Sequence, residues 1–309
     1  MSSPPYDPRL TERRNPRTAD IDLASPREIV QLMNAEDQSV AAAVRAQADG
    51  IAKAVELAEA AFRAGGRLLY VGAGTSGRLG VLDASECPPT FGTDPEMVQG
   101  IIAGGPGALT RSQEGAEDQA ADGAATMVER AVTTRDLVVG IAASGTTPFV
   151  RGALERAMAL GAKTVIVACS KLPPDLARAV TVAIVVLTGP EAVTGSTRLK
   201  AGTATKMVLN MISTGALVRL GKTYGNLMVD LRAMSAKLVD RGERIVMEVC
   251  GVERAAAHEL IERAGGSVKT AIVMAKLRAE RAAAEAKLAD AGGVIRRAVG
   301  EDPPPTRAG

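Results

Sequence analysis

The sequence predicts an α/β fold in three layers, a central parallel sheet flanked by helices, followed by a small all-helical C-terminal domain. Short apolar runs rich in β-branched residues alternate with helical stretches in the middle of the chain, which is typical of parallel strands buried on both faces. After Asp230 no strand candidate persists, and glycines separate successive helical stretches. These two observations define the fold class.

The same patterns divide the 309-residue chain into five parts. Ser25 is a helix N-cap, with Pro26 in the first turn and Glu28 placed to complete a capping box, whereas the preceding residues are Pro- and Arg-rich without periodicity. We expect an N-terminal arm (1–24), N-terminal helices (25–49), an α/β domain (50–222), a C-terminal helical domain (223–300) and a disordered tail (301–309).

The individual elements follow from hydrophobic periodicity. The expected strands are 67–71, 98–103, 137–142, 164–168 and 181–187. The expected helices of the α/β domain include 108–132, 147–160 and 196–220. In the C-terminal domain the expected helices are 234–250, 252–264, 267–277, 279–291 and 293–299.

Composition excludes several classes of function. Lys and Arg total 37 against 35 acidic residues, without a long basic block, so the chain lacks the electrostatic footprint of nucleic-acid binding. The three cysteines are too widely spaced for a disulfide framework or a zinc motif. No apolar run reaches the ~18 residues of a membrane span, and no signal peptide is recognisable. The sequence therefore predicts a soluble cytoplasmic protein with no metal, cofactor, nucleic-acid or membrane partner.

A glycine-rich turn, Gly72-Ala-Gly-Thr-Ser-Gly77, follows the first expected strand. Glycines let the backbone approach an anion and present N–H groups to it, and Gly74, Thr75 and Ser76 are the expected phosphate ligands. The turn also satisfies the dinucleotide fingerprint, which requires an acid about 20 residues on, at the end of a second strand. That zone contains Pro88-Pro89, which excludes a central strand. We therefore reject dinucleotide binding.

A second hydroxyl-rich turn, Ser144-Gly145-Thr146-Thr147, follows another expected strand. Either turn alone also reads as a helix N-cap. Two of them at the carboxyl ends of parallel strands converge on the crevice where open α/β sheets bind ligands, which favours a sugar phosphate. A third segment, from Glu191 through Ser196 to Lys200, opens the helix after the last strand. Lys200 or Arg198 is its candidate cation, and either is equally consistent with a solvated helix-start charge.

These motifs resemble the N-acetylmuramic acid 6-phosphate etherase family of the sugar isomerase (SIS) superfamily. The resemblance runs from Thr11 to Gly293 and is carried by residues 72–80, 83–90, 114–118, 193–206 and 225–230. The string Ser-Glu-Cys-Pro-Pro at 85–89 is its most specific part. The resemblance implies an SIS domain, a homodimer, and cleavage of the D-lactyl ether of the sugar phosphate to N-acetylglucosamine 6-phosphate and D-lactate, by elimination and hydration.

The resemblance also implies two catalytic acids, Glu86 as the proton donor and Glu117 as the second acid/base. The donor must be protonated near neutral pH, and its neighbours Cys87, Pro88 and Pro89 predict burial that raises its pKa. Glu117 lies among Glu114, Asp118 and Gln119, a hydrated context that we expect to keep it ionised. Taken without the resemblance, residues 114–118 favour a solvated acidic helix start, and the resemblance reverses that preference.

Two other functions use the same fold. A non-catalytic phosphosugar sensor, similar to the glucokinase regulatory protein, needs the hydroxyl turns but not both acids. An aldose–ketose isomerase needs one base and releases no lactate. Cys87 has no histidine near it in sequence and is interpreted as a small buried hydrophobe. His258, the single histidine, is interpreted as a helix-surface residue.

Overall fold

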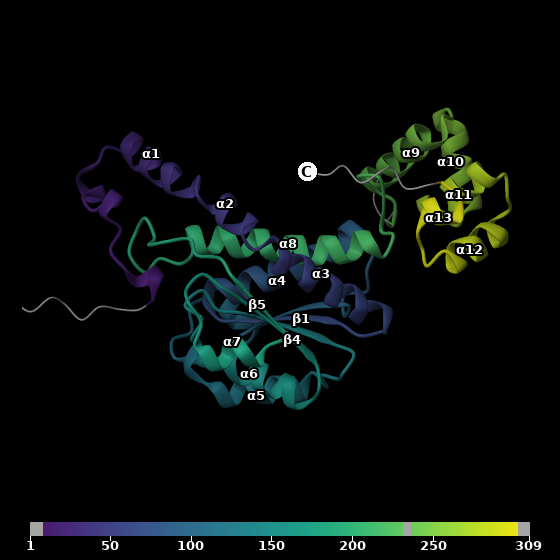
Figure 1. Ribbon diagram of the computed structural model, residues 1–309. Coiled ribbons are helices and arrows are strands. Elements are labelled where there is room, and N and C mark those ends of the chain that lie inside the picture. Colours follow the sequence, from purple (N-terminus) through teal and green to yellow (C-terminus); the bar gives the residue numbers. More distant parts are fainter. Residues whose placement is uncertain (1–8, 231–235, 302–309) are drawn as a thin grey trace, which may run out of the picture. The chain divides into compact units, whose positions relative to one another are not determined.

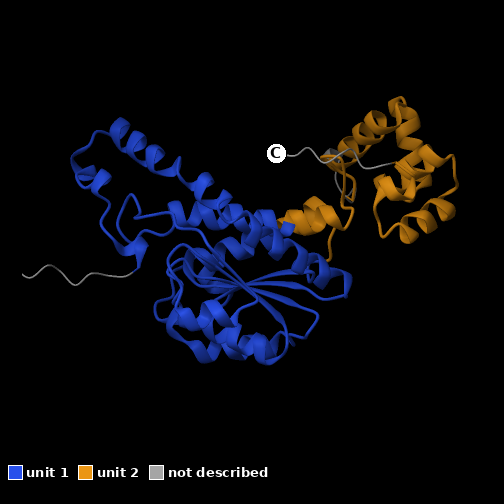
Figure 2. Cartoon of the chain, in the orientation of Figure 1, with its two compact units in different colours: residues 1–85, 95–213 blue, residues 86–94, 214–309 orange. Residues whose placement is uncertain are grey.

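The computed structural model describes residues 9–230 and 236–301, which form two compact units (Figure 2). The first unit comprises residues 1–85 and 95–213, and the second comprises 86–94 and 214–309. Residues 302–309 of the expected tail and the expected helix start at 234 lie outside the described residues. None of the helices in the described part of the chain combines the length and apolarity needed to cross a membrane.

A five-stranded parallel sheet forms the centre of the first unit, in the order β2-β1-β3-β4-β5 (Figure 1). Its strands are β1 (Leu68–Gly72), β2 (Val98–Ile102), β3 (Leu137–Ile141), β4 (Lys163–Ala168) and β5 (Val182–Val185). All five expected strands are thereby confirmed. The chain passes from β1 to β2 at one edge and returns to the other side of β1 for β3. This reversal places a topological switch point between β1 and β3, where open α/β sheets bind ligands.

Helices flank this sheet, as its continuous apolar strands predicted. They are α3 (Ala48–Arg63), α4 (Gly74–Phe91), α5 (Ala120–Glu129), α6 (Pro148–Ala159), α7 (Pro174–Ala179) and α8 (Lys200–Arg219). The helix expected over 108–132 is shorter than predicted. Two 3-10 turns, η4 (Pro106–Leu109) and η5 (Ala116–Asp118), replace its first part. Gly115, at φ +75°, has a left-handed backbone that interrupts any helix there.

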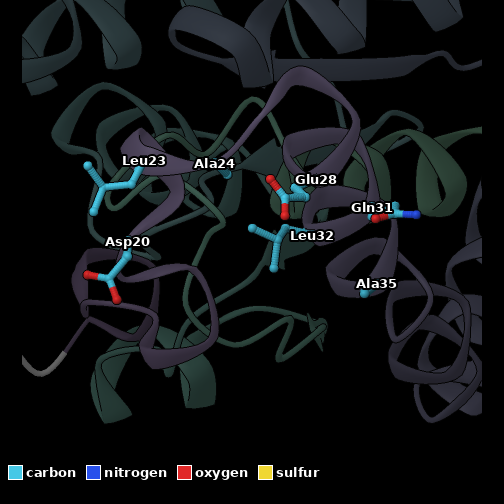
Figure 3. A pocket seen from close by; sticks show the side chains of 7 residues that line it. All are labelled: Asp20, Leu23, Ala24, Glu28, Gln31, Leu32 and Ala35. Atoms are coloured by element: carbon cyan, nitrogen blue, oxygen red, sulfur yellow. The ribbon is translucent and has the colours of Figure 1, made fainter.

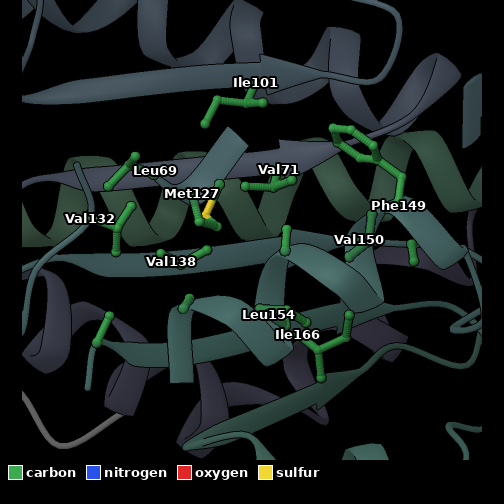
Figure 4. Packing of buried hydrophobic residues seen from close by; sticks show 14 of the residues in the cluster. Leu69, Val71, Ile101, Met127, Val132, Val138, Phe149, Val150, Leu154 and Ile166 are labelled. Atoms are coloured by element: carbon green, nitrogen blue, oxygen red, sulfur yellow. The ribbon is translucent and has the colours of Figure 1, made fainter. Parts of the chain in front are cut away.

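A cluster of buried apolar residues lies between the sheet and the α5–α6 pair (Figure 4). Leu69 and Val71 of β1 and Val138 of β3 meet Met127 of α5 and Leu154 of α6, all with exposed fractions of 1% or less. Successive strand residues face opposite sides, and every residue of β1 and β3 is buried. This core fixes the carboxyl ends of β1 and β3.

The N-terminal region holds a confirmed capping box and an arm that contacts the rest of the first unit. Ser25 caps α1 (Pro26–Asp37) in a capping box with Glu28, as predicted, and α2 (Val40–Arg45) follows. The arm before it is not a free tail. It forms three 3-10 turns, η1 (Leu10–Glu12), η2 (Pro16–Thr18) and η3 (Ile21–Leu23), and hydrogen bonds join residues 11–18 to the loop at 190–195. Short turns without periodicity leave no signal in the sequence.

The second unit is mainly helical, as predicted. Its helices are α9 (Ala236–Cys250), α10 (Arg254–Arg263), α11 (Val268–Leu277), α12 (Arg281–Asp290) and α13 (Ile295–Ala298). Val246, Ala257, Ile272 and Ile295 are buried in their common core. A small antiparallel pair, β6 (Thr223–Tyr224) and β7 (Leu227–Met228), was not expected. Two-residue strands are too short to show alternation.

Candidate phosphate-binding and active site

The glycine-rich turn is the N-terminal end of α4. Gly74 has a φ of +52°, which glycine adopts without strain. A Cβ atom on Gly77 would lie 2.6 Å from Cγ1 of Ile102 and 2.8 Å from the carbonyl oxygen of Gly72. The helix therefore packs directly on the ends of β1 and β2. First-turn N–H groups, including those of Thr75 and Ser76, lack acceptors within the helix, and this end of a helix favours an anion.

A cavity of about 310 Å³ opens beside the start of α4. It is lined by Ala73, Gly74, Arg78, Ala103, Ala108, Ser112, Gln113, Glu114, Gly115, Ala116 and Glu117. Two hydrogen bonds fix the Arg78 side chain in the cavity lining. Its Nη2 donates to the carbonyl oxygen of Ala108 at 2.7 Å, and its Nε donates to that of Leu109 at 3.0 Å. Glu117, on η5, is exposed. The cavity therefore combines a helix N-terminus with an accessible carboxylate.

Glu86 does not line this cavity. It lies on α4 within the second unit, whereas every lining residue belongs to the first. Its expected burial is wrong for this chain, because helical spacing turns Ala84 and Cys87 inward and Ser85 and Glu86 outward. Sequence neighbours on a helix do not share an environment. Cys87 is buried, as expected.

The second hydroxyl-rich turn connects β3 to α6. Ser144 Oγ accepts hydrogen bonds from the N–H and Oγ1 of Thr146, at 3.3 and 3.1 Å. Gly145, at φ +77°, turns the chain, and Thr147 is the N-cap position of α6. Gly72 pairs with Ile141 in the parallel ladder between β1 and β3. The two turns thus leave neighbouring strands at one edge of the sheet, on either side of the switch point.

The third segment, before α8, is arranged differently from the expectation. Glu191 is fully buried and accepts the N–H groups of Lys200 and Ala201, both at 2.9 Å. Burial raises the pKa of the Glu191 carboxyl. Lys200 is 1% exposed, and its Nζ donates to Glu36 at 2.6 Å. Both side chains therefore hold the start of α8, and neither offers a free charge to a ligand in this chain.

The start of α8 nevertheless lies beside the start of α4. A Cβ atom on Gly202 would lie 3.8 Å from Cγ2 of Thr75 and 3.3 Å from the carbonyl oxygen of Thr197. Ser196 is half-buried in the turn before α8, and its N–H donates to the carbonyl oxygen of Val193 at 2.9 Å. Two helix N-termini are therefore adjacent in the first unit.

A second cavity, of about 550 Å³, lies between η3 and α1 (Figure 3). Asp20, Leu23, Ala24, Glu28, Gln31, Leu32 and Ala35 line it. Leu23 is 82% exposed. Its lining holds two acids, Asp20 and Glu28, and no basic side chain, and Glu28 is already used in the capping box of α1, so the cavity does not suit an anionic phosphosugar.

Other candidate groups lie outside the site. His258 is on α10 with its side chain 53% exposed, so its interpretation as a surface residue is confirmed. Within residues 9–230 and 236–301, no three His, Cys, Asp or Glu side chains are grouped so as to hold a metal ion.

Comparison with known proteins finds a family model for part of the chain and relatives that match most of it. Residues 50–158 match the family described as the glucokinase regulatory protein N-terminal SIS domain. The chain is 56% identical over 265 residues to the N-acetylmuramic acid 6-phosphate etherase of Serratia proteamaculans (strain 568), covering 86% of this chain and 89% of the relative. It is 55% identical over 264 residues to the enzyme of the same name from Mycolicibacterium smegmatis (strain ATCC 700084 / mc(2)155), covering 85% and 88%.

Proposed function

The chain belongs to the N-acetylmuramic acid 6-phosphate etherase family, and from this premise we propose that it cleaves the D-lactyl ether of N-acetylmuramic acid 6-phosphate. The products are N-acetylglucosamine 6-phosphate and D-lactate, so the protein is a carbon–oxygen lyase of amino-sugar recycling. The observation that carries the proposal is the cavity in which Glu117 shares a wall with Gly74 at the N-terminus of α4.

The 6-phosphate binds at the carboxyl edge of the sheet. Gly74, Thr75 and Ser76 offer first-turn N–H groups and two hydroxyls, and Ser144, Gly145, Thr146 and Thr147 form the opposite side of the switch point. Ser196 adds a hydroxyl from the turn before α8. Glu191 and Lys200 contribute by fixing the start of α8 through their buried contacts.

The reaction is an elimination followed by hydration. In the open-chain sugar the C1 aldehyde acidifies the C2 proton. Glu117 removes that proton, the bond between C3 and the ether oxygen breaks, and Glu86 gives a proton to the departing lactate oxygen. Water then adds to the double bond, its oxygen to C3 and its proton to C2. Each proton transfer contributes roughly 10²–10⁴-fold.

Glu86 is exposed in the single chain. In a homodimer, the second copy would bury its side chain. Leu82 is 50% exposed and lies one helical turn before Glu86 on the same face of α4. Met211 of α8, at 43%, and Val30 of α1, at 66%, are further exposed apolar side chains. A second copy packed on such side chains removes apolar area from water.

A cytoplasmic location fits the free thiols of all three cysteines.

The proposal is tested by incubating the protein with N-acetylmuramic acid 6-phosphate in D₂O and following both D-lactate and deuterium at C2. We expect Glu117→Gln and Glu86→Gln each to lower kcat by about 10²-fold or more. Glu129→Gln, at the exposed end of α5, is the matched control and should retain wild-type turnover.

The rival functions give different results in the same assay. A phosphosugar sensor binds the compound without releasing lactate, and an aldose–ketose isomerase exchanges the C2 proton without releasing lactate. Wild-type lactate release by Glu117→Gln or Glu86→Gln would remove that residue from the mechanism.

A further inference from the structure

We propose that the N-terminal segment 11–18, together with Glu36, positions the start of α8 for phosphate binding. These are positioning residues, because they act through the loop at 190–199 and do not themselves contact the reacting atoms. The inference deepens the proposed function by assigning a role in substrate affinity to a part of the chain whose sequence suggests only an arm.

Segment 11–18 contacts the loop directly. Thr18 Oγ1 donates to the carbonyl oxygen of Ala192 at 2.8 Å, and both residues are buried. The N–H of Gly195 donates to the carbonyl oxygen of Thr11 at 3.1 Å, and Asn15 Nδ2 donates to that of Pro190 at 3.4 Å. Three hydrogen bonds from residues about 175 positions away in sequence therefore hold one side of the loop.

A buried ion pair holds the first residue of α8. Glu36 accepts from Lys200 Nζ at 2.6 Å and from Arg17 Nη2 at 2.8 Å. Glu36 and Lys200 are 3% and 1% exposed. Hydrogen bonding to Arg17, followed by that to Lys200, lowers the pKa of Glu36 to about 2 against the opposing effect of burial. The first residue of α8 is thus tied through Glu36 to Arg17 of the segment.

The loop connects the N-terminal segment to the proposed phosphate site. No helix or strand lies between Val185 and Lys200, so the loop has no regular structure of its own to fix its position. Glu191 within it binds the N–H groups of Lys200 and Ala201, and the next residue, Gly202, adjoins Thr75 in the first turn of α4. A shift of the loop therefore displaces one of the two adjacent helix N-termini.

The experiment separates positioning from general stability. Thr18→Val keeps the shape of the side chain but leaves the buried carbonyl of Ala192 without its donor. We expect it to weaken binding of N-acetylglucosamine 6-phosphate, measured by calorimetry, about five- to tenfold. KM for the substrate should rise by the same factor while kcat stays near wild type. Thr18→Ser retains the hydroxyl and should keep both the Kd and the KM near their wild-type values.

Thr164→Val is the matched control. Thr164 is also buried, and its hydroxyl accepts the N–H of Thr181 at 3.3 Å at the beginning of β4, opposite the carboxyl edge of the sheet. We expect both Thr164→Val and Thr18→Val to lower the melting temperature. Thr164→Val should leave the Kd for N-acetylglucosamine 6-phosphate at its wild-type value. Equal Kd values for Thr18→Val and wild type would overturn the positioning role.

The two proposals fail separately. Wild-type protein that binds the sugar phosphate but releases no lactate disproves the etherase reaction, and the Kd comparison still decides the role of residues 11–18. Wild-type protein that binds neither N-acetylglucosamine 6-phosphate nor inorganic phosphate has no phosphate site to position, which overturns this inference as well.

Discussion

Two glutamates of this protein each bind an arginine and a second basic side chain, but in different surroundings. Glu36 in the first unit binds Arg17 and the buried Lys200. Glu243 in the second unit binds Arg254 at 2.6 Å and His258 at 2.9 Å, whose side chains are 48% and 53% exposed. If Glu243 is removed, water can hydrate the exposed Arg254 and His258. If Glu36 is removed, water cannot reach the buried Lys200 ammonium in the same way. Burial of the cation, rather than the number of ion pairs, therefore decides how much each cluster contributes.

The largest expected effect is that of Glu36→Gln. It takes from the buried Lys200 ammonium the carboxylate that it hydrogen-bonds, and breaking a buried ion pair typically costs about 3–5 kcal/mol of unfolding free energy. Glu243→Gln should cost no more than about 1 kcal/mol, because both of its cations remain hydrated. Urea unfolding followed by circular dichroism measures both losses, and peptide-level hydrogen exchange assigns each to its unit. Equal losses in the two variants would contradict the comparison.

Acid should weaken the first cluster next. The folded-state pKa of Glu36, about 2, lies below its ordinary value of 4.5. Its contribution is therefore fully present above pH 4.5 and is lost as the pH falls toward 2, by up to about 3 kcal/mol. Urea unfolding at a series of pH values should show the gap between wild type and Glu36→Gln narrowing over this window. Curves that stay parallel would mean that Glu36 does not titrate as the buried contacts require.

Local patterns were enough to predict most of the fold. All five strands, the capping box of Ser25 and Glu28, and the glycine-separated helices of the second unit follow from residues a few positions apart. The hydroxyl turns could also be placed at one sheet edge, since parallel strands point the same way. The Glu36–Lys200 pair spans 164 positions, and nothing near either residue in sequence indicates the other.

The predicted site shows the same limit. Glu191 and Lys200 have the composition of a phosphate-binding segment, yet their charges are used inside the protein. Glu86 has apolar sequence neighbours, yet α4 turns it outward. In both cases the residue type is informative, but the direction of the side chain depends on tertiary packing that a single sequence does not report.

The smallest effect concerns His258 and tests whether the exposed cluster forms an ion pair in solution. The hydrogen bond to Glu243 and the charge of Glu262 raise the pKa of His258 above 6.5, so its stabilisation is present below pH 6.5 and is lost as the pH rises through the higher folded-state value. Because the chain has one histidine, its Hε1 proton gives a single NMR signal to titrate. Glu243→Gln should move the midpoint back toward 6.5. A wild-type midpoint at or below 6.5 would mean that exposure removes the ion pair altogether, and the contrast with Glu36 would then be sharper.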